Sequence, residues 1–253
     1  MSSLEKKKEK LHLRDLGSKL IELGRQENLR QGMIGKVIVS KLRMMKHPEE
    51  HSGYLKVFPN YKHQNRGDGF GCMSLSPMSL GPVDHGQPEL PMAKNIENFH
   101  QGSKCFKEET DEEGNPSAVY KQNRQEFYKD KTPHRHKYMG LDKKNRNIPL
   151  YFVWIDMDKK EHHLSYFECR QFYCTFYERL ASKQEDFLKL QELIWNGTNI
   201  QICGYDGRSI EDRSIEEEYF DGSKPFGHEL VLATMLREKP ENYPWRKYKK
   251  FDF

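Results

Sequence analysis

The sequence predicts a helix-rich α+β fold with a small sheet. Three kinds of pattern support this class. Leucines recur at three- and four-residue steps through the first thirty residues, which is typical of an amphipathic helix. Aromatics and leucines at helical spacing predict two core helices, at 167–177 and 187–195. Short apolar runs predict strands at Val37–Val39, Pro149–Asp156 and Ile200–Cys203.

The remaining elements follow from turn and capping signals. The polar, glycine-containing stretch 46–71 predicts a long surface excursion, and the proline-rich stretch 72–91 predicts an ordered loop. Asn95 is a good N-cap for a helix that begins at Ile96. The other expected elements are an acidic connector at 108–116, a short helix at 123–128, a hairpin partner at 163–166 and a helix at 230–236 that starts just after Gly227.

The chain of 253 residues is long enough to bury a sizeable core, and no internal repeat is visible. We expect three parts: a basic N-terminal helix and loop extension at 1–66, a main domain at 67–240, and a C-terminal tail at 241–253. Five cysteines without a C-x-x-C pair argue against a disulfide framework and against a zinc ribbon.

Charge and hydropathy indicate the cellular location and the kind of partner that we expect. The first residues lack the apolar run of a signal peptide, and no stretch reaches 18 apolar residues, so we expect a cytoplasmic or nuclear protein without a membrane partner. The formal charge of +4 is concentrated in the first 66 residues and in 121–146. A basic N-terminal third (Lys6, Lys7, Lys8, Lys41, Arg43, Lys46, Lys62 and Arg66) favours nucleic acid as a partner. A lysine-rich solvated surface is the alternative.

The sharpest local pattern is Glu97-Asn98-Phe99-His100-Gln101-Gly102-Ser103-Lys104. On a helix, Glu97, Gln101 and Lys104 fall at i, i+4 and i+7, so one face would carry a carboxylate, an amide and an ammonium group. A glycine inside a helix costs about 1 kcal/mol relative to alanine, and this cost is often accepted where a ligand or another backbone approaches closely. The alternative is an ordinary exposed polar face.

Other candidates are less specific. The run His134-Arg135-His136-Lys137 suits phosphate contact, with a solvated loop as the alternative. The pair His162-His163 has no cysteine or carboxylate at a recognised metal-ligand spacing, so we expect no metal site. Glu168 is interpreted as a capping residue. Cys169 and Cys174 have no base near them in the sequence, which argues against a thiol nucleophile.

Five segments, in order, resemble the NADAR (YbiA-like) family of N-glycosidases. The family carries a loop L-S-N-F-Y-x-x-P-I and a helix E-H-x-Y-Q-x-x-K, to which Leu75–Val83 and the Glu97–Lys104 segment are similar. Its later half is K-F-x-x-N-x-x-L-x-x-x-L-L-x-T-G, then a strand, an aspartate and L-G-x-x-L-M-x-x-R. Similar segments here are 187–197, 200–206 and 226–237.

The resemblance implies an enzyme that hydrolyses a ribosyl N-glycosidic bond. Family substrates are phosphoribosylated riboflavin-pathway intermediates in one branch and ADP-ribosylated nucleobases in another. The resemblance implies Glu97 and Asp206 as catalytic carboxylates, with a nucleotide or ADP-ribosyl substrate and no cofactor or metal. It implies a substrate-binding role for Gln101, Lys104, Ser76, His100 and Gly227.

The alternative function is a non-catalytic nucleotide-binding, nucleic-acid-binding or structural protein of the same fold. The family's D-x-x-W-G segment is replaced by the polar stretch 207–224, and the region 105–165 is longer than in the family. A cleft with Glu97 facing Asp206 would favour the enzyme. A cleft filled by Tyr205, Tyr219 or the 207–224 stretch would favour the alternative.

Overall fold

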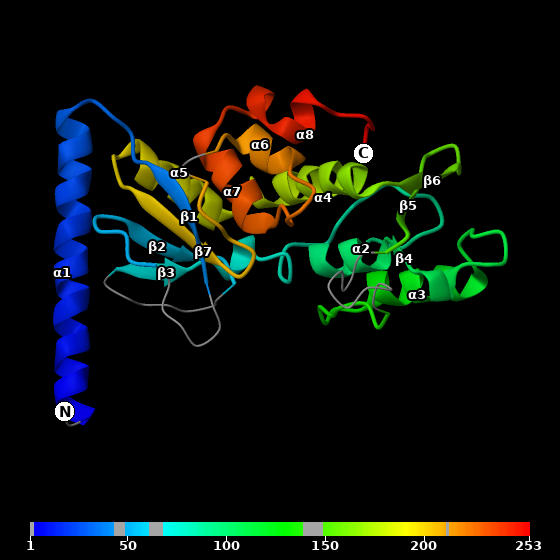
Figure 1. Cartoon of the computed structure of the whole chain (residues 1–253), viewed down its shortest axis with the longest axis horizontal. Coiled ribbons are helices and arrows are strands. Elements are labelled where there is room, and N and C mark those ends of the chain that lie inside the picture. Colours follow the sequence, from blue (N-terminus) through cyan, green and yellow to red (C-terminus); the bar gives the residue numbers. More distant parts are fainter. Residues whose placement is uncertain (1–2, 43–48, 61–67, 139–148, 211–212) are drawn as a thin grey trace. The chain divides into compact units, whose positions relative to one another are not determined.

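The computed structural model describes residues 3–42, 49–60, 68–138, 149–210 and 213–253 (Figure 1). It confirms the helix-rich α+β class. The chain falls into two compact units: unit 1 is formed by 1–76 and 181–244, and unit 2 by 77–180 and 245–253. These limits differ from the boundaries expected at 66/67 and 240/241, because each unit combines segments that are distant in the sequence. The two units are described separately below.

Unit 1 is built around a parallel sheet with the strand order β1-β7-β2-β3. Ile200 of β7 pairs with Val37 of β1 on one side and with Leu55 of β2 on the other. Its elements are α1 Ser3–Arg30, β1 Val37–Lys41, β2 Leu55–Phe58, β3 Gly69–Gly71, a 3-10 turn Met73–Leu75, α5 Glu185–Trp195, β7 Ile200–Gly204, α6 Ile215–Phe220, α7 His228–Arg237 and a 3-10 turn Pro240–Asn242. The expected first helix, the strands at 37–39 and 200–203, and the last long helix are all confirmed.

The expectation of a surface excursion at 46–71 is wrong for 55–58 and 69–71, whereas 49–54 is an irregular segment with no buried residue. Strands β2 and β3 lie in this stretch, and β2 is an inner strand of the sheet. The apolar pattern that would indicate β2 is interrupted by Lys56, which lies inside this four-residue strand. Lys56 is only 3% exposed, because its Nζ lies 2.6 Å from Glu50 Oε2 and 3.0 Å from Asp68 Oδ2.

Helix α1 packs in unit 1 through small and polar residues. A Cβ at Gly17 would lie 3.2 Å from Asp68 Cβ, and a Cβ at Gly24 would lie 3.4 Å from the carbonyl oxygen of Gly53. Asn28 donates to the Gly197 carbonyl at 2.7 Å. The leucines that predicted the helix remain largely exposed, Leu13 by 59% and Leu23 by 60%. The period of the leucines therefore predicted the helix correctly but not the face that packs.

Unit 2 combines an antiparallel sheet, in the order β4-β5-β6, with helices. Its elements are α2 Ile96–Gly102, β4 Lys104–Cys105, a 3-10 turn Lys107–Glu109, α3 Ala118–Lys129, β5 Tyr151–Ile155, β6 Glu161–Leu164 and all but the last residue of α4 Tyr166–Ala181; α8 Pro244–Lys247 starts at the unit boundary. The expected hairpin is confirmed, since Phe152 pairs with Leu164 across β5 and β6. Helix α3 is longer than expected, because Ser117 caps it by accepting from the Tyr120 amide.

Aromatic side chains form the centre of unit 2. The rings of Phe99 and Phe172 lie 4.6 Å apart, and those of Phe99 and Phe176 lie 4.9 Å apart. Each of these phenylalanines is 1% exposed. Burial of such rings is a large part of the stabilisation of a small core. The interpretation of the Phe172–Tyr177 cluster as core is therefore confirmed for its buried members.

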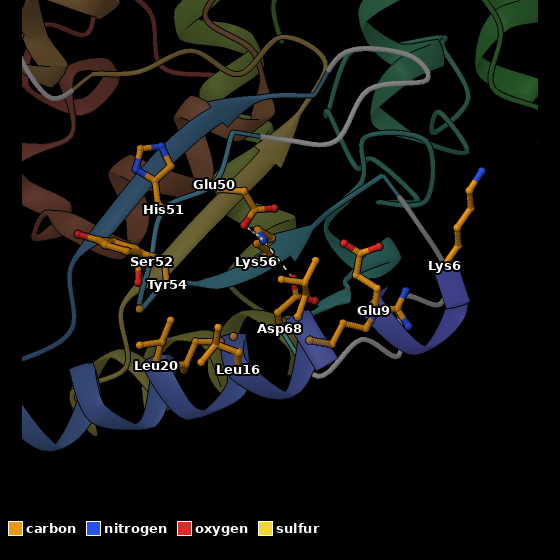
Figure 2. Close-up of a pocket in the computed structure, with 15 residues that line it drawn as sticks. Lys6, Glu9, Leu16, Leu20, Glu50, His51, Ser52, Tyr54, Lys56 and Asp68 are labelled. Atoms are coloured by element: carbon orange, nitrogen blue, oxygen red, sulfur yellow. Dashed lines mark hydrogen bonds and ion pairs between the residues drawn. The ribbon is translucent and has the colours of Figure 1, made fainter. Parts of the chain in front are cut away.

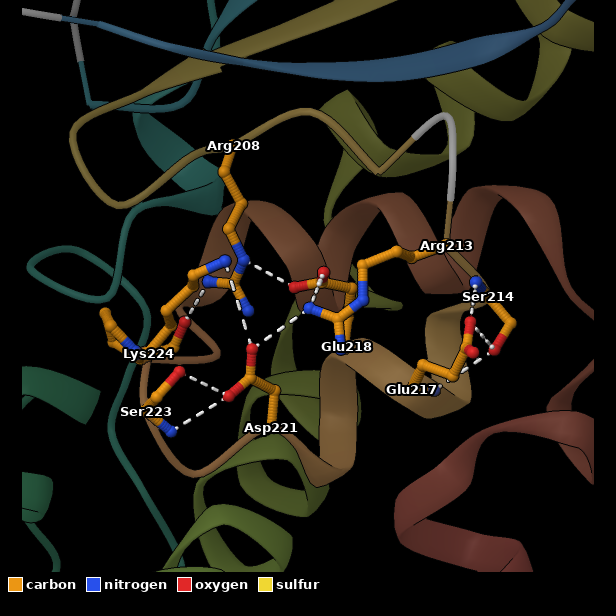
Figure 3. A network of polar contacts seen from close by, with 9 residues as sticks. Arg208, Arg213, Ser214, Glu217, Glu218, Asp221, Ser223 and Lys224 are labelled. Atoms are coloured by element: carbon orange, nitrogen blue, oxygen red, sulfur yellow. Dashed lines mark hydrogen bonds and ion pairs between the residues drawn. The ribbon is translucent and has the colours of Figure 1, made fainter.

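The polar stretch 207–224 contains helix α6, which the sequence analysis missed. A capping box starts this helix, with Ser214 Oγ accepting from the Glu217 amide at 3.1 Å. Figure 3 shows the charged network around it: Glu218, whose side chain is 1% exposed, contacts Arg208 at 2.5 Å and Arg213 at 2.9 Å. The S-x-x-E signature was available in the sequence as Ser214-Ile215-Glu216-Glu217.

Candidate functional site

The first turn of α2 presents Glu97. The helix starts as predicted, because the Asn95 side chain accepts a hydrogen bond from the Asn98 amide at 2.8 Å. Glu97 is half-buried, and its Oε1 accepts from Gln101 Nε2 at 3.0 Å. A carboxylate in the first turn of a helix is stabilised by the free backbone amides there. Glu97 and Gln101 therefore form a fixed pair on one face of α2.

The loop at 132–136 is tied to the same helix. The His136 amide donates to Gln101 Oε1 at 3.3 Å, and the His134 amide donates to Asn98 Oδ1 at 3.0 Å. Asn98 Nδ2 also donates to the carbonyls of Asp130 and Thr132, each at 3.0 Å. Because Gln101 bonds both Glu97 and this loop, its amide orientation is determined by its partners.

Lys104 is not on the helix face where the i+7 spacing placed it. Helix α2 ends at Gly102, and Lys104 lies in β4, paired with Phe152 of β5. A Cβ at Gly102 would lie 2.9 Å from both Phe127 Cβ and Tyr128 Cε1. The glycine is thus required by close packing of α3, and the approach of a ligand is not needed to explain it. The expected three-residue helical face is corrected to a helical pair followed by a strand residue.

Lys104 is buried in unit 2 without a close charged partner among the described residues. Its side chain is 6% exposed, and its Nζ makes no hydrogen bond or ion pair with a residue that the structure describes. Burial lowers the pKa of Lys104, and Arg135 lowers it further, while Cys169 and Glu97 act in the opposite direction. A buried ammonium group without a close anionic partner is costly, which makes it a candidate for ligand contact.

His100 and Cys169 form a pair that the sequence analysis did not find. His100 Nδ1 lies 3.8 Å from Cys169 Sγ, and the imidazole also packs on Phe152 and Tyr173. Burial raises the pKa of the Cys169 thiol, and burial together with Lys104 holds the pKa of His100 well below its usual range. Both groups are therefore neutral near pH 7, and the pair lacks the thiolate that a nucleophilic cysteine needs.

The side chains of the expected phosphate-contact run 134–137 lie in different environments, some buried and some exposed. His136 is 6% exposed, its Nε2 lies 3.3 Å from Glu109 Oε1, and its ring packs on Phe106. His136 is therefore a core residue, which corrects its assignment to phosphate contact. His134 stacks on Phe127 with its ring centroid 4.4 Å away. Arg135 and Lys137 remain exposed, as a phosphate contact would require.

In unit 1, expected site residues gather at the carboxyl edge of the parallel sheet. Asp206 follows β7, and Ser76 follows the turn after β3. Gly227 is the N-cap of α7, and a Cβ on it would lie 2.9 Å from Asp206 Cβ. Asp206 is exposed, whereas Ser76 is fully buried with its Oγ 3.5 Å from Asn60 Oδ1. Ligands of open parallel sheets commonly bind outside this edge.

Glu229 at this edge was also missed. It is fully buried, and neither carboxylate oxygen makes a hydrogen bond with any described residue. Its Oε2 lies 3.2 Å from His228 Nδ1, and a Cβ at Gly204 would meet its Oε1 at 1.9 Å. The only sequence signal was a glutamate directly before the apolar run 230–233 of this helix.

The catalytic pair expected from the resemblance is divided between the units. Glu97 belongs to unit 2 and Asp206 to unit 1. The cleft between them therefore stays a prediction. Tyr219 is 4% exposed and packs on Phe220 and Phe226 within unit 1, so it is a core residue of that unit.

A cavity of about 520 Å³ lies in unit 1 beside α1 (Figure 2). Leu16 and Leu20 of α1 line one side, and the paired Lys56 and Asp68 line another. Lys6, Lys7, Lys8 and Lys41 of the expected basic third are exposed. Arg43, Lys46, Lys62 and Arg66 lie outside the described residues.

In the described part of the chain, no group of three or more histidine, cysteine, aspartate or glutamate side chains is placed to hold a metal ion. None of the helices in that part combines the length and the apolar character needed to cross a bilayer. Comparisons with family models, curated proteins and solved structures find no match for this chain.

Proposed function

We propose that the chain hydrolyses a ribosyl N-glycosidic bond of a nucleotide-derived substrate, such as an ADP-ribosylated or otherwise modified nucleobase. The observation that carries the proposal is the group formed by Glu97, Gln101 and Lys104 in unit 2. A half-buried carboxylate is held by an amide at 3.0 Å, and its charge acts against the lowering of the pKa of the buried Lys104 by burial. The resemblance to the NADAR family implies the same three residues.

The chemistry follows from the charges. Breaking the bond between C1′ and the base nitrogen builds positive charge on the ribose, and a carboxylate beside C1′ stabilises that charge or accepts a proton from the attacking water. The water oxygen bonds to C1′, and the leaving nitrogen takes a proton. Glu97 is assigned the carboxylate role, and Gln101 orients it. Lys104 binds an oxygen of the substrate, and Asp206 orients a ribose hydroxyl or the water.

The partners of the proposed enzyme follow from its surface. The exposed Lys6, Lys7 and Lys8 on α1 suit an anionic partner, and nucleic acid carrying the modified base is the version of the substrate they favour. We extend the proposal to an intracellular setting, in the cytoplasm or nucleus, where such substrates occur.

The test is hydrolysis followed by mass spectrometry. ADP-ribosylated guanine DNA and ADP-ribose-type nucleotides are offered to the wild type and to Glu97→Gln. We expect the variant to lose at least about a hundredfold in rate, because removal of one acid–base group typically costs about 10²- to 10⁴-fold. Glu108→Gln, at an exposed carboxylate of unit 2, is the matched control and should keep the wild-type rate.

Equal rates in Glu97→Gln and the wild type would remove Glu97 from the mechanism. Absence of turnover by folded wild type, together with measurable binding of the same substrates, would replace the enzyme with the non-catalytic binding protein of the same fold.

A further inference from the structure

A second cavity, of about 290 Å³, lies entirely within unit 2. The loop 88–90, helix α3 and the β5–β6 hairpin supply its walls. The residues that matter for its chemistry are Tyr120, Lys121, Arg124, Lys159, Glu89 and Glu161. None of them belongs to the Glu97 group, and no sequence motif pointed to this cavity.

Arg124 is the unusual member of this wall. It is 2% exposed, and its guanidinium group donates only to neutral acceptors. Nε donates to Tyr128 Oη at 3.2 Å, and Nη2 donates to Gln87 Oε1 at 2.5 Å and to the Val153 carbonyl at 3.0 Å. Nη1 makes no hydrogen bond with a described residue.

The charge of Arg124 is not neutralised at short range. No carboxylate of the described residues forms an ion pair with it, although an arginine side chain is always protonated in proteins. Glu89 lies 2.6 Å from Lys159, and Glu161 lies 2.9 Å from His163, which neutralises a carboxylate only when it is protonated. The charged lining side chains are the cations Lys121, Arg124 and Lys159 and the carboxylates Glu89 and Glu161. The cations outnumber the carboxylates, so the cavity has a net positive character.

Gln87, next to the lining residue Pro88, holds Arg124 in place. Its Oε1 accepts from Arg124 and, at 3.0 Å, from the Ile155 amide, so its carboxamide has one orientation. Its Nε2 is buried and has no hydrogen-bond partner among the described residues. A buried guanidinium group without a counter-ion is costly in an empty site, and a bound anion lowers that cost.

We propose that this cavity binds the phosphoryl group of a small ligand, with Arg124 as the main anion contact and Lys121 at the rim. An oxyanion accepts from the N–H groups of Nη1, which no described residue uses, and its charge offsets that of the guanidinium group. The volume accommodates a phosphate with part of the molecule that carries it. The proposal is independent of the proposed glycosidase activity, because it uses neither Glu97 nor Asp206.

The experiment is calorimetric titration of the full chain at low ionic strength. Inorganic phosphate, ribose 5-phosphate and AMP are the phosphoryl probes, and citrate tests whether any polyanion suffices. We expect saturable one-site binding of at least one phosphoryl probe. Tighter binding of an ester than of free phosphate would identify a phosphorylated metabolite as the source, and the reverse order would identify the free ion.

Variants locate the site. Arg124→Lys keeps the charge but loses the Nη1 donors, and we expect at least roughly tenfold weaker binding. If that variant does not fold, Lys121→Ala gives the decision, with an expected weakening of roughly threefold or more. Lys129→Ala, an exposed lysine on the same helix but outside the cavity, should bind like the wild type. Absence of saturable binding by folded wild type would overturn the proposal. Equal weakening of binding by Lys121→Ala and Lys129→Ala would also overturn it. So would citrate binding as tightly as every phosphoryl probe.

Discussion

Lys56 in unit 1 and Arg124 in unit 2 are buried cations with similar exposure, 3% and 2%. Lys56 has two carboxylates within 3.0 Å, whereas Arg124 has three neutral acceptors and no ion-pair partner among the described residues. Glu218 of unit 1 resembles Lys56 in this respect, since two arginines contact it. A neutralised buried charge needs no function to explain it, but an isolated one is stabilised when an anion arrives.

Among the substitutions that test this comparison, the largest loss in the free energy of unfolding is expected at Lys56. In Lys56→Ala, the nearly buried Asp68 loses its ion pair with Lys56, and we expect a loss of about 3–5 kcal/mol in the free energy of unfolding. Urea denaturation measures it. Lys41→Ala, at the exposed end of β1, is the control and should change stability by less than about 0.5 kcal/mol. Asp68→Asn added to Lys56→Ala should recover part of the loss, and no recovery would show that the charge of Asp68 is not the cause.

A smaller loss is expected at Arg124. Arg124→Met leaves behind neutral acceptors but no carboxylate, so we expect about 1–3 kcal/mol in the absence of ligand. The same urea titration, repeated with a saturating phosphoryl probe, should stabilise the wild type but not the variant. A loss in the absence of ligand as large as that of Lys56→Ala would break the comparison, because it would place Arg124 among the structural charges.

The smallest change in stability is expected at alkaline pH, where buried cysteine thiols ionise. Burial raises the pKa of the Cys72 thiol from 9.0 to about 12 and that of Cys105 from 9.0 to about 11. Because the folded pKa is the higher one, the stabilisation is complete below about pH 9 and is lost as the pH rises towards these values. Urea midpoints measured from pH 8 to pH 11 should fall, and the fall should be smaller in Cys72→Ala. An unchanged slope in that variant would contradict the assignment to Cys72.

Local patterns in the sequence were sufficient for much of the fold. Asn95, the β5 apolar run and the Gly227 helix start were each identified correctly, because caps and periodicity act over a few residues. Strand β2 was missed, because the partners that allow Lys56 to be buried lie at 50 and 68. Its burial depends on tertiary contacts that no local pattern contains.

The candidate site was predicted less completely. The pairing of Glu97 with Gln101 followed from helical spacing and was found, but the position of Lys104 was wrong. A helix end caused by packing at Gly102 depends on Phe127 and Tyr128, which are more than twenty residues away. Glu229 and Arg124 could not be recognised, because a charged residue in a sequence is expected at the surface unless its surroundings are known.

The position of β7 has a consequence for the order in which the chain can fold during synthesis. Residues 200–204 form the strand between β1 and β2, although they are made after about four-fifths of the chain. Until they leave the ribosome, β1 and β2 each have an unpaired edge, a state that invites association with other chains. Sheets assembled from such distant segments also form slowly. Unit 1 should therefore depend on chaperones or slow translation more than its modest size suggests.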